Sequence, residues 1–269
     1  MGSGVAHMAV IAIYSMKGGV GKTTLAVDLA WRFAALGGRR TLLWDLDPQG
    51  GAGFLLGQEP APGARAAAIF QRDGKPRQLI EPTAYKGLSL LPADESLRHL
   101  PGQLARLGQR KRLAQMTTLL KGDHERIVLD CPAGMNEVSE QVIAAADLLI
   151  VPLPPSPLSA RALDMLRNEL ARHHHRHPPL LPVLSLYNSR RPLHRAVRHG
   201  QAAAWPIVPL ATQLEQVAVQ RAPLGTFAPS SDAARAMQRL YGGIETKLAQ
   251  SAPAPRPAQA LFGRQPVTA

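Results

Sequence analysis

A glycine-rich segment near the start of the chain constrains the fold more than any other feature. Residues 16–24 read Met-Lys-Gly-Gly-Val-Gly-Lys-Thr-Thr, between an apolar run at 9–15 and a helical pattern at 22–36. Glycines let backbone N–H groups converge on an anion without a side-chain clash, and a helix N-terminus adds partial positive charge. We therefore expect a phosphate-binding loop made of Gly18, Gly19, Val20, Gly21, Lys22, Thr23 and Thr24.

Two side chains of this loop have expected roles, and a third is unusual. Lys22 is expected to reach the β- and γ-phosphates of a nucleotide, and the Thr23 hydroxyl to hold Mg²⁺. The usual pattern has glycine five residues before Gly21, but Met16 stands there and Lys17 follows it. A second lysine could be a solvated surface charge, yet the turn around it is otherwise tightly constrained. That constraint favours a functional role for Lys17.

Apolar runs and helical patterns alternate along the rest of the chain. We expect strands at 9–15, 41–47, 88–91, 126–130, 148–153, 181–186 and 207–210. We expect helices at 22–36, 104–121, 137–145, 159–175 and 231–249. Residues 57–86 are rich in Pro, Gly and Ala, and predict loops with a short helix. Several strands are apolar along their whole length, which predicts an α/β fold with a mostly parallel, doubly wound sheet covered on both faces.

The 269 residues suit one α/β domain. Residues 1–7 resemble a cloning scar before a native Met8, residues 8–249 form the expected domain, and residues 250–269 read as a disordered Ala/Pro-rich tail. No apolar run of about eighteen residues occurs, and no secretory signal is present. The single cysteine, Cys131, excludes an internal disulfide and a multi-cysteine metal site within one chain. These features predict a cytoplasmic protein.

The net charge is +12. A soluble domain this basic usually binds a polyanion, most often DNA. The alternative is a GC-rich genome that favours Arg codons.

Two acidic motifs follow expected strands. Asp45-Leu-Asp-Pro-Gln-Gly50 closes the strand at 41–47, and Asp130-Cys-Pro-Ala-Gly134 closes the strand at 126–130. With residues 16–24, they resemble the ParA/MinD (SIMIBI) family of deviant Walker A P-loop ATPases, most closely its small ParA- and Soj-like partition and positioning proteins. Ala133 stands where the family often has Pro.

The resemblance implies roles for the charged residues of these motifs. Lys17 crosses to the ATP of the partner subunit in a face-to-face dimer, and Asp47 helps to activate the attacking water. The expected metal-site residues are Thr23, Asp45 and Asp130, with Asp130 reaching Mg²⁺ through water. Phosphoryl transfer fits this set, because it needs a positioned water, a metal and charge neutralisation rather than a covalent group.

The resemblance also implies partners. ATP and Mg²⁺ support a homodimer that binds nucleoid DNA without sequence preference, and an activating partner protein stimulates hydrolysis to release a plasmid, chromosome or protein-assembly cargo. Asn188 is expected to contact the adenine. Arg191, Arg195 and Arg198 have helical spacing and form the first candidate DNA patch. Weaker DNA candidates are Arg161, Arg167, Arg172 and Arg221.

Three other readings remain. A MinD-like regulator would act at a membrane or on a protein machine, although the tail carries only Leu261 and Phe262 as a bulky apolar pair, which disfavours membrane attachment. A metabolic P-loop enzyme would not need Lys17. His173 and His177 could share a weak metal site, but a solvated helix end before two prolines explains them better.

Overall fold

The computed structural model describes residues 8–59, 65–71, 73–108, 111–173 and 177–251. The expected cloning scar at 1–7 and nearly all of the expected tail lie outside the described residues, so both stay predictions. None of the helices in the described part of the chain is both long and apolar enough to span a bilayer.

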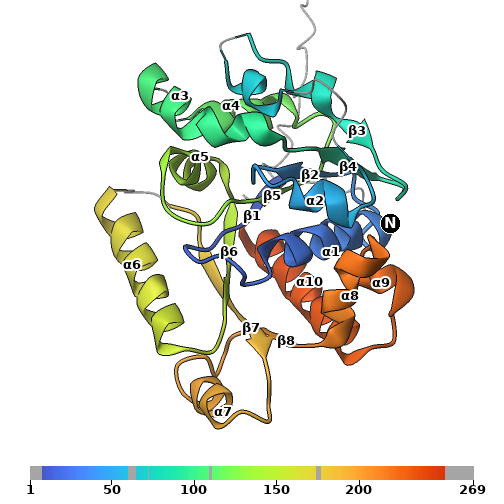
Figure 1. Ribbon diagram of the computed structural model, residues 1–269, viewed down its shortest axis with the longest axis vertical. Coiled ribbons are helices and arrows are strands. Elements are labelled where there is room, and N and C mark those ends of the chain that lie inside the picture. Colours follow the sequence, from blue (N-terminus) through green and yellow to red (C-terminus); the bar gives the residue numbers. More distant parts are fainter. Residues whose placement is uncertain (1–7, 60–64, 72, 109–110, 174–176, 252–269) are drawn as a thin grey trace, which may run out of the picture.

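A central sheet of eight strands organises the described residues (Figure 1). Its order is β3-β4-β2-β5-β1-β6-β7-β8. All neighbouring strands run parallel except β3, which pairs antiparallel with β4 at one edge. The strands are β1 (Ala9–Ile13), β2 (Thr41–Asp45), β3 (Glu81–Pro82), β4 (Leu88–Leu91), β5 (Arg126–Asp130), β6 (Leu148–Leu153), β7 (Leu180–Tyr187) and β8 (Ile207–Pro209). The expected α/β fold with a mostly parallel sheet is confirmed.

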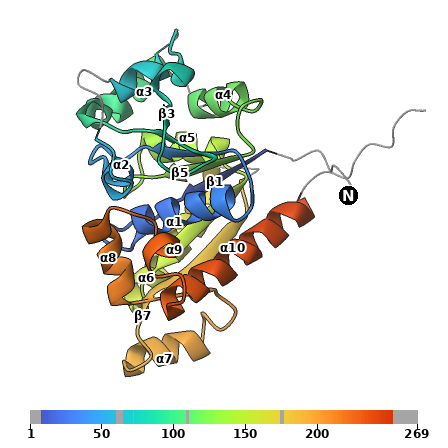
Figure 2. The ribbon, with the colours of Figure 1, turned by 90° about the vertical axis from the view of Figure 1, so that its right-hand side faces the viewer.

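Helices connect the strands and cover both faces of the sheet (Figure 2). The α-helices are α1 (Lys22–Ala35), α2 (Gly51–Leu55), α3 (Leu100–Leu107), α4 (Arg112–Leu119), α5 (Glu137–Ala145), α6 (Pro157–His173), α7 (Pro192–His199), α8 (Thr212–Gln220), α9 (Leu224–Phe227) and α10 (Asp232–Ser251). The described residues also form the 3₁₀ helices η1 (Ala66–Phe70), η2 (Pro76–Leu79) and η3 (Glu95–His99).

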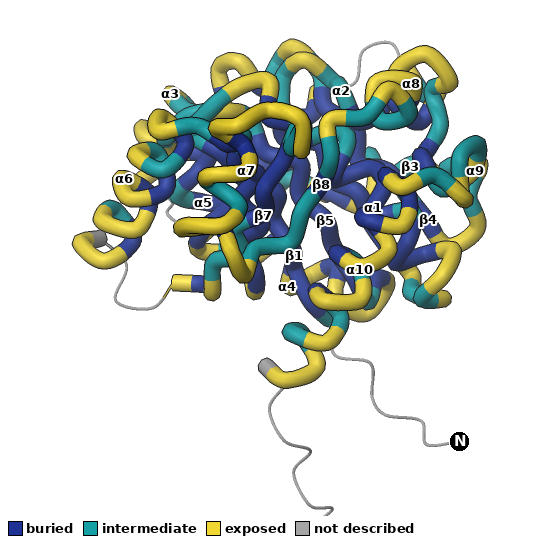
Figure 3. Tube along the Cα trace, turned by 90° about the horizontal axis from the view of Figure 1, so that it is seen from below, coloured by how far each residue is buried: buried dark blue, intermediate teal, exposed yellow. Residues whose placement is uncertain are grey.

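Two hydrophobic cores lie on opposite faces of the sheet. Alternate residues of β1 divide between them, with Val10 and Ala12 in one core and Ile11 and Ile13 in the other. This division follows from the period of two along a strand. Helices α3, α4, α5 and α6 pack on the first core, whereas α1, α8, α9 and α10 pack on the second. The central strands are accordingly buried, while the outer helix faces are exposed (Figure 3).

The structure corrects two expectations. The single helix expected at 104–121 is two helices, because Gly108 adopts a left-handed conformation (φ 61°) that ends α3. Residues 57–86 contain loops as expected, but the described residues there also form η1, η2 and the antiparallel strand β3 instead of one short helix. In addition, α10 runs through Ser251 and so includes the first two residues of the expected tail.

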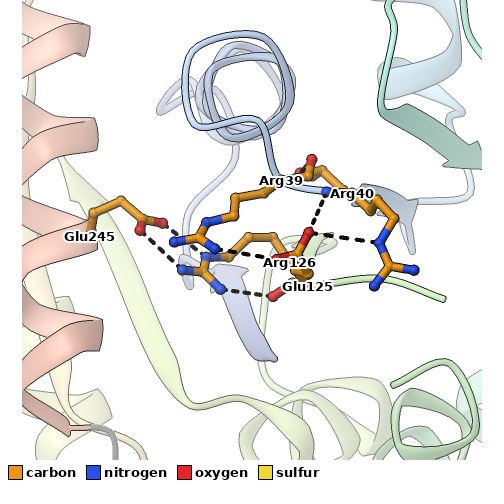
Figure 4. A network of polar contacts seen from close by, with 6 residues as sticks. Arg39, Arg40, Glu125, Arg126 and Glu245 are labelled. Atoms are coloured by element: carbon orange, nitrogen blue, oxygen red, sulfur yellow. Dashed lines mark hydrogen bonds and ion pairs between the residues drawn. The ribbon is translucent and has the colours of Figure 1, made fainter. Parts of the chain in front are cut away.

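An ionic network fastens α10 to the edge of the sheet where the parallel strands begin (Figure 4). Arg126, the first residue of β5, donates to both carboxylate oxygens of Glu245 on α10, at 2.9 and 3.0 Å. Glu125 in turn pairs with Arg39 and Arg40, at 3.3 and 3.7 Å. Because the Arg126 side chain is nearly buried, removal of Glu245 is expected to cost about 3 kcal/mol. This network lies opposite the edge that carries the phosphate loop.

Candidate nucleotide-binding site

The carboxyl ends of β1, β5 and β2 bring the three sequence motifs together. The phosphate loop follows β1, and Ile13 at the end of β1 lies beside Asp130 of β5. Asp130 in turn lies opposite Asp45 of β2. Neighbouring strands are about 4.8 Å apart. The fold therefore assembles the loop and both strand-end carboxylates at one edge of the sheet, as the motifs predict.

The glycines of the loop leave open space beside its backbone. Gly19 and Gly21 have φ of 69° and 88°, a conformation that favours glycine. A Cβ atom added at Gly18, Gly19 or Gly21 would meet no atom within 4 Å. Gly21 is the N-cap of α1, and neither a capping side chain nor an acidic residue satisfies the first turn of that helix. These features suit an anion at the helix N-terminus.

The two lysines of the loop differ in their surroundings. Lys22 is 8% exposed, and its Nζ lies 3.4 Å from the carbonyl oxygen of Lys17. The backbone N–H of Lys17 donates to Ser15 Oγ at 3.2 Å, which holds the start of the loop. The Lys17 side chain is partly exposed and makes no ion pair with any described residue. Lys22 is thus folded into the loop, whereas the Lys17 side chain is more exposed.

The two strand-end carboxylates are buried and differ in their hydrogen bonding. Asp45 accepts from the backbone N–H groups of Asp47 and Ala52, both at 2.9 Å. Burial nevertheless raises the pKa of Asp45 to about 7. Burial, and then the neighbouring charge of Asp45, raise the pKa of Asp130 well above its ordinary value.

Asp130 is the carboxylate that fits a metal ion. Neither of its oxygens has a hydrogen-bond partner among the described residues, although the side chain is fully buried. An unpaired buried carboxylate is costly unless it meets a cation or a donor. Thr23 interacts with Asp130 and lowers its pKa, so these two expected metal-site residues are neighbours. The donor set of carboxylate and hydroxyl oxygens suits Mg²⁺.

Gly50 and Gly51 complete this corner of the site, and the sequence analysis assigned them no role. Gly50 has a left-handed conformation (φ 65°) that starts α2. A Cβ at Gly51 would lie 3.1 Å from Cγ2 of Thr23. The two consecutive glycines after Gln49 are the sequence feature from which close packing against Thr23 could have been predicted. Asp47, the expected water-activating residue, is partly exposed. Its side chain accepts from the backbone N–H of Gln49, and its carbonyl oxygen accepts from the N–H of Gly50, so it forms a turn with these residues.

Cys131 follows Asp130 directly and is buried. Burial raises the pKa of its thiol well above the ordinary value, and the charge of Asp130 acts in the same direction.

Asn188 lies at the same edge of the sheet, two strands away from β1. Its Oδ1 accepts from the backbone N–H of Arg190 at 2.9 Å, and its own N–H donates to Nδ1 of His194. Leu186 just before it has φ of 52°, at an irregularity in the pairing of β7 with β8. The predicted adenine contact is therefore on a turn with defined geometry, and it stays a prediction.

The arginines that the sequence suggested for DNA differ in the contacts they make within the protein. Arg191 is the exposed N-cap of α7, and Arg195 on α7 donates to the carbonyl oxygens of Ser189 and Arg190. Arg198 donates to the carbonyl oxygens of Ala202, Ala203 and Trp205, so it holds the turn after α7. The expected cluster is thus partly engaged by the protein itself.

The weaker candidates are dispersed. Arg161 and Arg167 lie on α6, and Arg167 pairs with Asp164 at 3.5 Å. Arg221 ends α8 with φ of 48°, pairs with Glu59 at 2.6 Å and stacks on Phe54. Arg172 is exposed near the end of α6. These residues lie on α6 and at the end of α8, whereas Arg191 begins α7, and their DNA contacts stay predictions.

A parallel sheet with a glycine-rich loop between β1 and α1, and an unpaired carboxylate on the adjacent strand, define a P-loop nucleotide-binding protein.

A family profile described as an AAA domain matches residues 8–181. The chain is 34% identical over 164 residues to the chromosome partitioning protein ParA of Myxococcus xanthus, and this match covers 60% of the chain but only 57% of that protein. It is 30% identical over 252 residues to the chromosome-partitioning ATPase Soj of Thermus thermophilus, covering 90% of this chain and 97% of that one.

A solved structure of Cyanothece McdA in complex with ATP has the same fold. Its TM-score is 0.77 at 21% identity, with 89% of this chain and 97% of that chain covered. The chain belongs to the ParA/MinD family of P-loop proteins with a deviant Walker A loop.

Proposed function

We propose that this protein is a ParA-type ATPase that dimerises on ATP and binds DNA in the dimeric state. One observation carries the proposal: the phosphate loop holds two lysines, of which Lys22 is folded inward and Lys17 makes no ion pair with the described residues. Such a charged side chain has no ion-pair partner among the described residues of its own subunit. It can therefore form a charge-assisted hydrogen bond with a phosphate that is bound by a second subunit. Family membership supports this reading.

The residues at the site suit slow hydrolysis of ATP. The loop N–H groups and Lys22 would hold the phosphates, and Thr23 and Asp130 would hold Mg²⁺, with Asp45 supporting the adjacent loop through its two hydrogen bonds. Magnesium, when bound, neutralises charge on the phosphates. Asp47 would orient the attacking water. The reaction needs no covalent intermediate on the protein.

DNA is the polyanion that the charge favours. The chain carries a net charge of +12, and a protein that neutralises several phosphates gains affinity from counterion release. The exposed arginines at the start of α7, Arg190 and Arg191, make no ion pair with a described residue. Relatives named for chromosome partitioning support the same reading. Binding to nucleoid DNA in the cytoplasm would then be controlled by ATP, and a partner protein that stimulates hydrolysis would release the dimer and move its cargo.

The first test is an electrophoretic shift of nonspecific duplex DNA, at fixed moderate salt, with ATP, with ADP and without nucleotide. A shift with ATP only, which weakens steeply as salt rises, supports the proposal. A dimer that forms with ATP but gives no shift would overturn the DNA part. It would then favour a MinD-like regulator of a membrane or protein machine.

A matched pair of variants tests the dimer. Lys22→Ala is expected to abolish ATP binding, because it removes the ammonium group inside the loop. Lys17→Ala removes an equal charge, but is expected to leave ATP binding within about threefold and to abolish ATP-dependent dimerisation. Equilibrium binding of a fluorescent ATP analogue and light scattering after size exclusion measure the two effects. A Lys17→Ala protein that still dimerises on ATP contradicts the proposed role.

A further inference from the structure

A buried tyrosine links the phosphate loop to the segment that follows the metal carboxylate. Tyr14 stands between the end of β1 and the loop, and is fully buried. Its backbone N–H donates to the carbonyl oxygen of Ile150 on β6 at 2.9 Å, which fixes the tyrosine to the sheet. Its hydroxyl donates to the carbonyl oxygen of Gly134 at 2.9 Å, across 120 positions of sequence.

Gly134 lies in a short segment, residues 131–135, that joins Asp130 to α5. The two ends of this segment are fixed. The N–H of Cys131 donates to the carbonyl oxygen of Ile13 at 3.3 Å, and Asn136 begins α5 with a capping box that involves Ser139. Gly134 itself has φ of 96°, so a side chain at this position would be strained.

The middle of the segment depends on Tyr14. Within the described part of the chain, no other hydrogen bond reaches residues 132–135. The ring alone could be supplied by phenylalanine, so the packing does not explain the hydroxyl. A buried hydroxyl without a partner would be destabilising, and this one is directed at the carbonyl oxygen of Gly134, in the segment that follows Asp130. Burial raises the pKa of Tyr14 to about 12, against the smaller opposing effect of a hydrogen bond with the Ser139 side chain of the α5 cap.

We propose that Tyr14 is a positioning residue, whose hydroxyl holds segment 131–135 at a fixed spacing from the phosphate loop. Segments that flank a bound γ-phosphate order and relax during nucleotide cycles in other P-loop proteins. A single neutral hydrogen bond is strong enough to bias such a segment and weak enough to break. By holding this segment, Tyr14 keeps Asp130 at a fixed position relative to the phosphate loop during turnover. This inference rests on the proposed ATPase function.

The test compares Tyr14→Phe with the wild-type protein and with Tyr85→Phe. Tyr85 is a partly buried tyrosine that precedes β4, far from the phosphate loop in the fold, so its variant controls for loss of one hydroxyl. The first measurement is hydrogen–deuterium exchange of peptides covering 131–136 in the nucleotide-free protein. Loss of one neutral hydrogen bond is expected to raise exchange there by about fivefold, with Tyr85→Phe unchanged. The second is steady-state ATP hydrolysis, where kcat is expected to fall by about fivefold while KM stays within about twofold.

Exchange and turnover that both equal the wild type would overturn the proposal. Faster exchange with unchanged kcat would also overturn it, because the bond would then be structural only. An equal fall in kcat for Tyr85→Phe would do the same. If the wild-type protein itself fails to hydrolyse ATP, the proposed function fails, and unchanged exchange in Tyr14→Phe remains a separate refutation of the positioning contact.

Discussion

Asp45 and Asp130 are directly opposite each other on β2 and β5, and both side chains are fully buried. Two backbone N–H groups satisfy Asp45, whereas neither oxygen of Asp130 has a partner at ordinary hydrogen-bond geometry among the described residues, although the nearby Thr23 hydroxyl lowers its pKa. Two adjacent buried carboxylates with only one satisfied are unfavourable for the protein alone. The arrangement is consistent with a site that gains its balancing charge from a bound cation.

Asp130→Asn is expected to stabilise the nucleotide-free protein by about 1 kcal/mol, equivalent to a Tm rise of about 2–4 °C, because it replaces a buried ionisable carboxyl group beside Asp45 by a neutral amide. The same variant is expected to lose the additional Tm increase that Mg²⁺ gives in the presence of ATP. Thermal unfolding with ATP, with and without Mg²⁺, measures both effects. A variant that is less stable alone yet keeps the Mg²⁺-dependent increase would contradict the metal assignment.

Asp47→Ala is expected to retain ATP affinity within about threefold and to lower kcat by at least about a hundredfold, because the water loses its orienting carboxylate. The ATP-bound dimer should then accumulate. Asp73→Ala is the control, since Asp73 is an exposed carboxylate outside the site. Light scattering and phosphate release measure the outcome, and a variant that stays monomeric with ATP would argue against this role.

Arg191→Glu is expected to weaken nonspecific DNA binding by about tenfold, because it reverses an exposed charge at the start of α7. Arg239→Glu on α10 makes the same change of charge at an exposed position and should weaken binding much less. Fluorescence anisotropy with labelled duplex DNA at two salt concentrations separates the two variants. If the two variants lose equal DNA affinity, the loss is due to the net charge of the protein and not to a contact made by α7.

Arg198→Ala is expected mainly to lower the stability of the protein, and to affect DNA binding only secondarily. Its guanidinium group holds three carbonyl oxygens of the turn between α7 and β8. Ala202 would keep the N–H of Trp205 as a donor, whereas Ala203 and Trp205 would lose the contact. We expect a loss of about 1–3 kcal/mol in the free energy of unfolding. Urea denaturation measures it, with Arg191→Ala as the control that should change stability by no more than about 0.5 kcal/mol.

His194 makes a pH-dependent contribution to the stability of the folded protein. Its Nδ1 accepts the N–H of Asn188, so the bond requires a neutral ring. Burial, with a smaller effect from Arg191, lowers the pKa of His194 below the ordinary 6.5. As the pH falls through 6.5, the unfolded chain binds a proton before the folded protein does, so this contribution to stability is lost.

The matching variant is His194→Asn, which does not titrate in this range. The stability of the wild-type protein relative to this variant is expected to decrease as the pH falls from 7.5 to 5.5. Other histidines are common to both proteins and cancel in the difference. A difference that is constant with pH would contradict the assigned bond.

The sequence predicted the parts of the fold that rest on local patterns. Strands β4, β5 and β6 have the expected limits, because fully buried parallel strands are continuous apolar runs. The loop and its flanking acids were also predictable, since their spacing along the chain determines where they stand at the sheet edge. Helix α8 carried a usable signal in the spacing of Leu214 and Val217, and it was not predicted.

Other features depend on tertiary contacts and have no local signal. Helix α2 is short and contains two glycines, so its helix propensity is low. It forms where Ala52 donates to Asp45. In the same way, the spacing of Arg198 suggested a DNA contact, while the carbonyl groups it binds come from the following turn. Arg221 likewise binds Glu59, which lies 162 positions away in the sequence.

The burial of Cys131 has a practical consequence for spectroscopy. It is the single cysteine of the chain, it lies in the interior, and its thiol resists ionisation. Thiol-directed dyes and spin labels react with the exposed thiolate. A cysteine introduced at an exposed position, such as Arg239 on α10, should therefore take up a maleimide probe selectively, and subunit exchange could be followed by energy transfer without replacing the native residue.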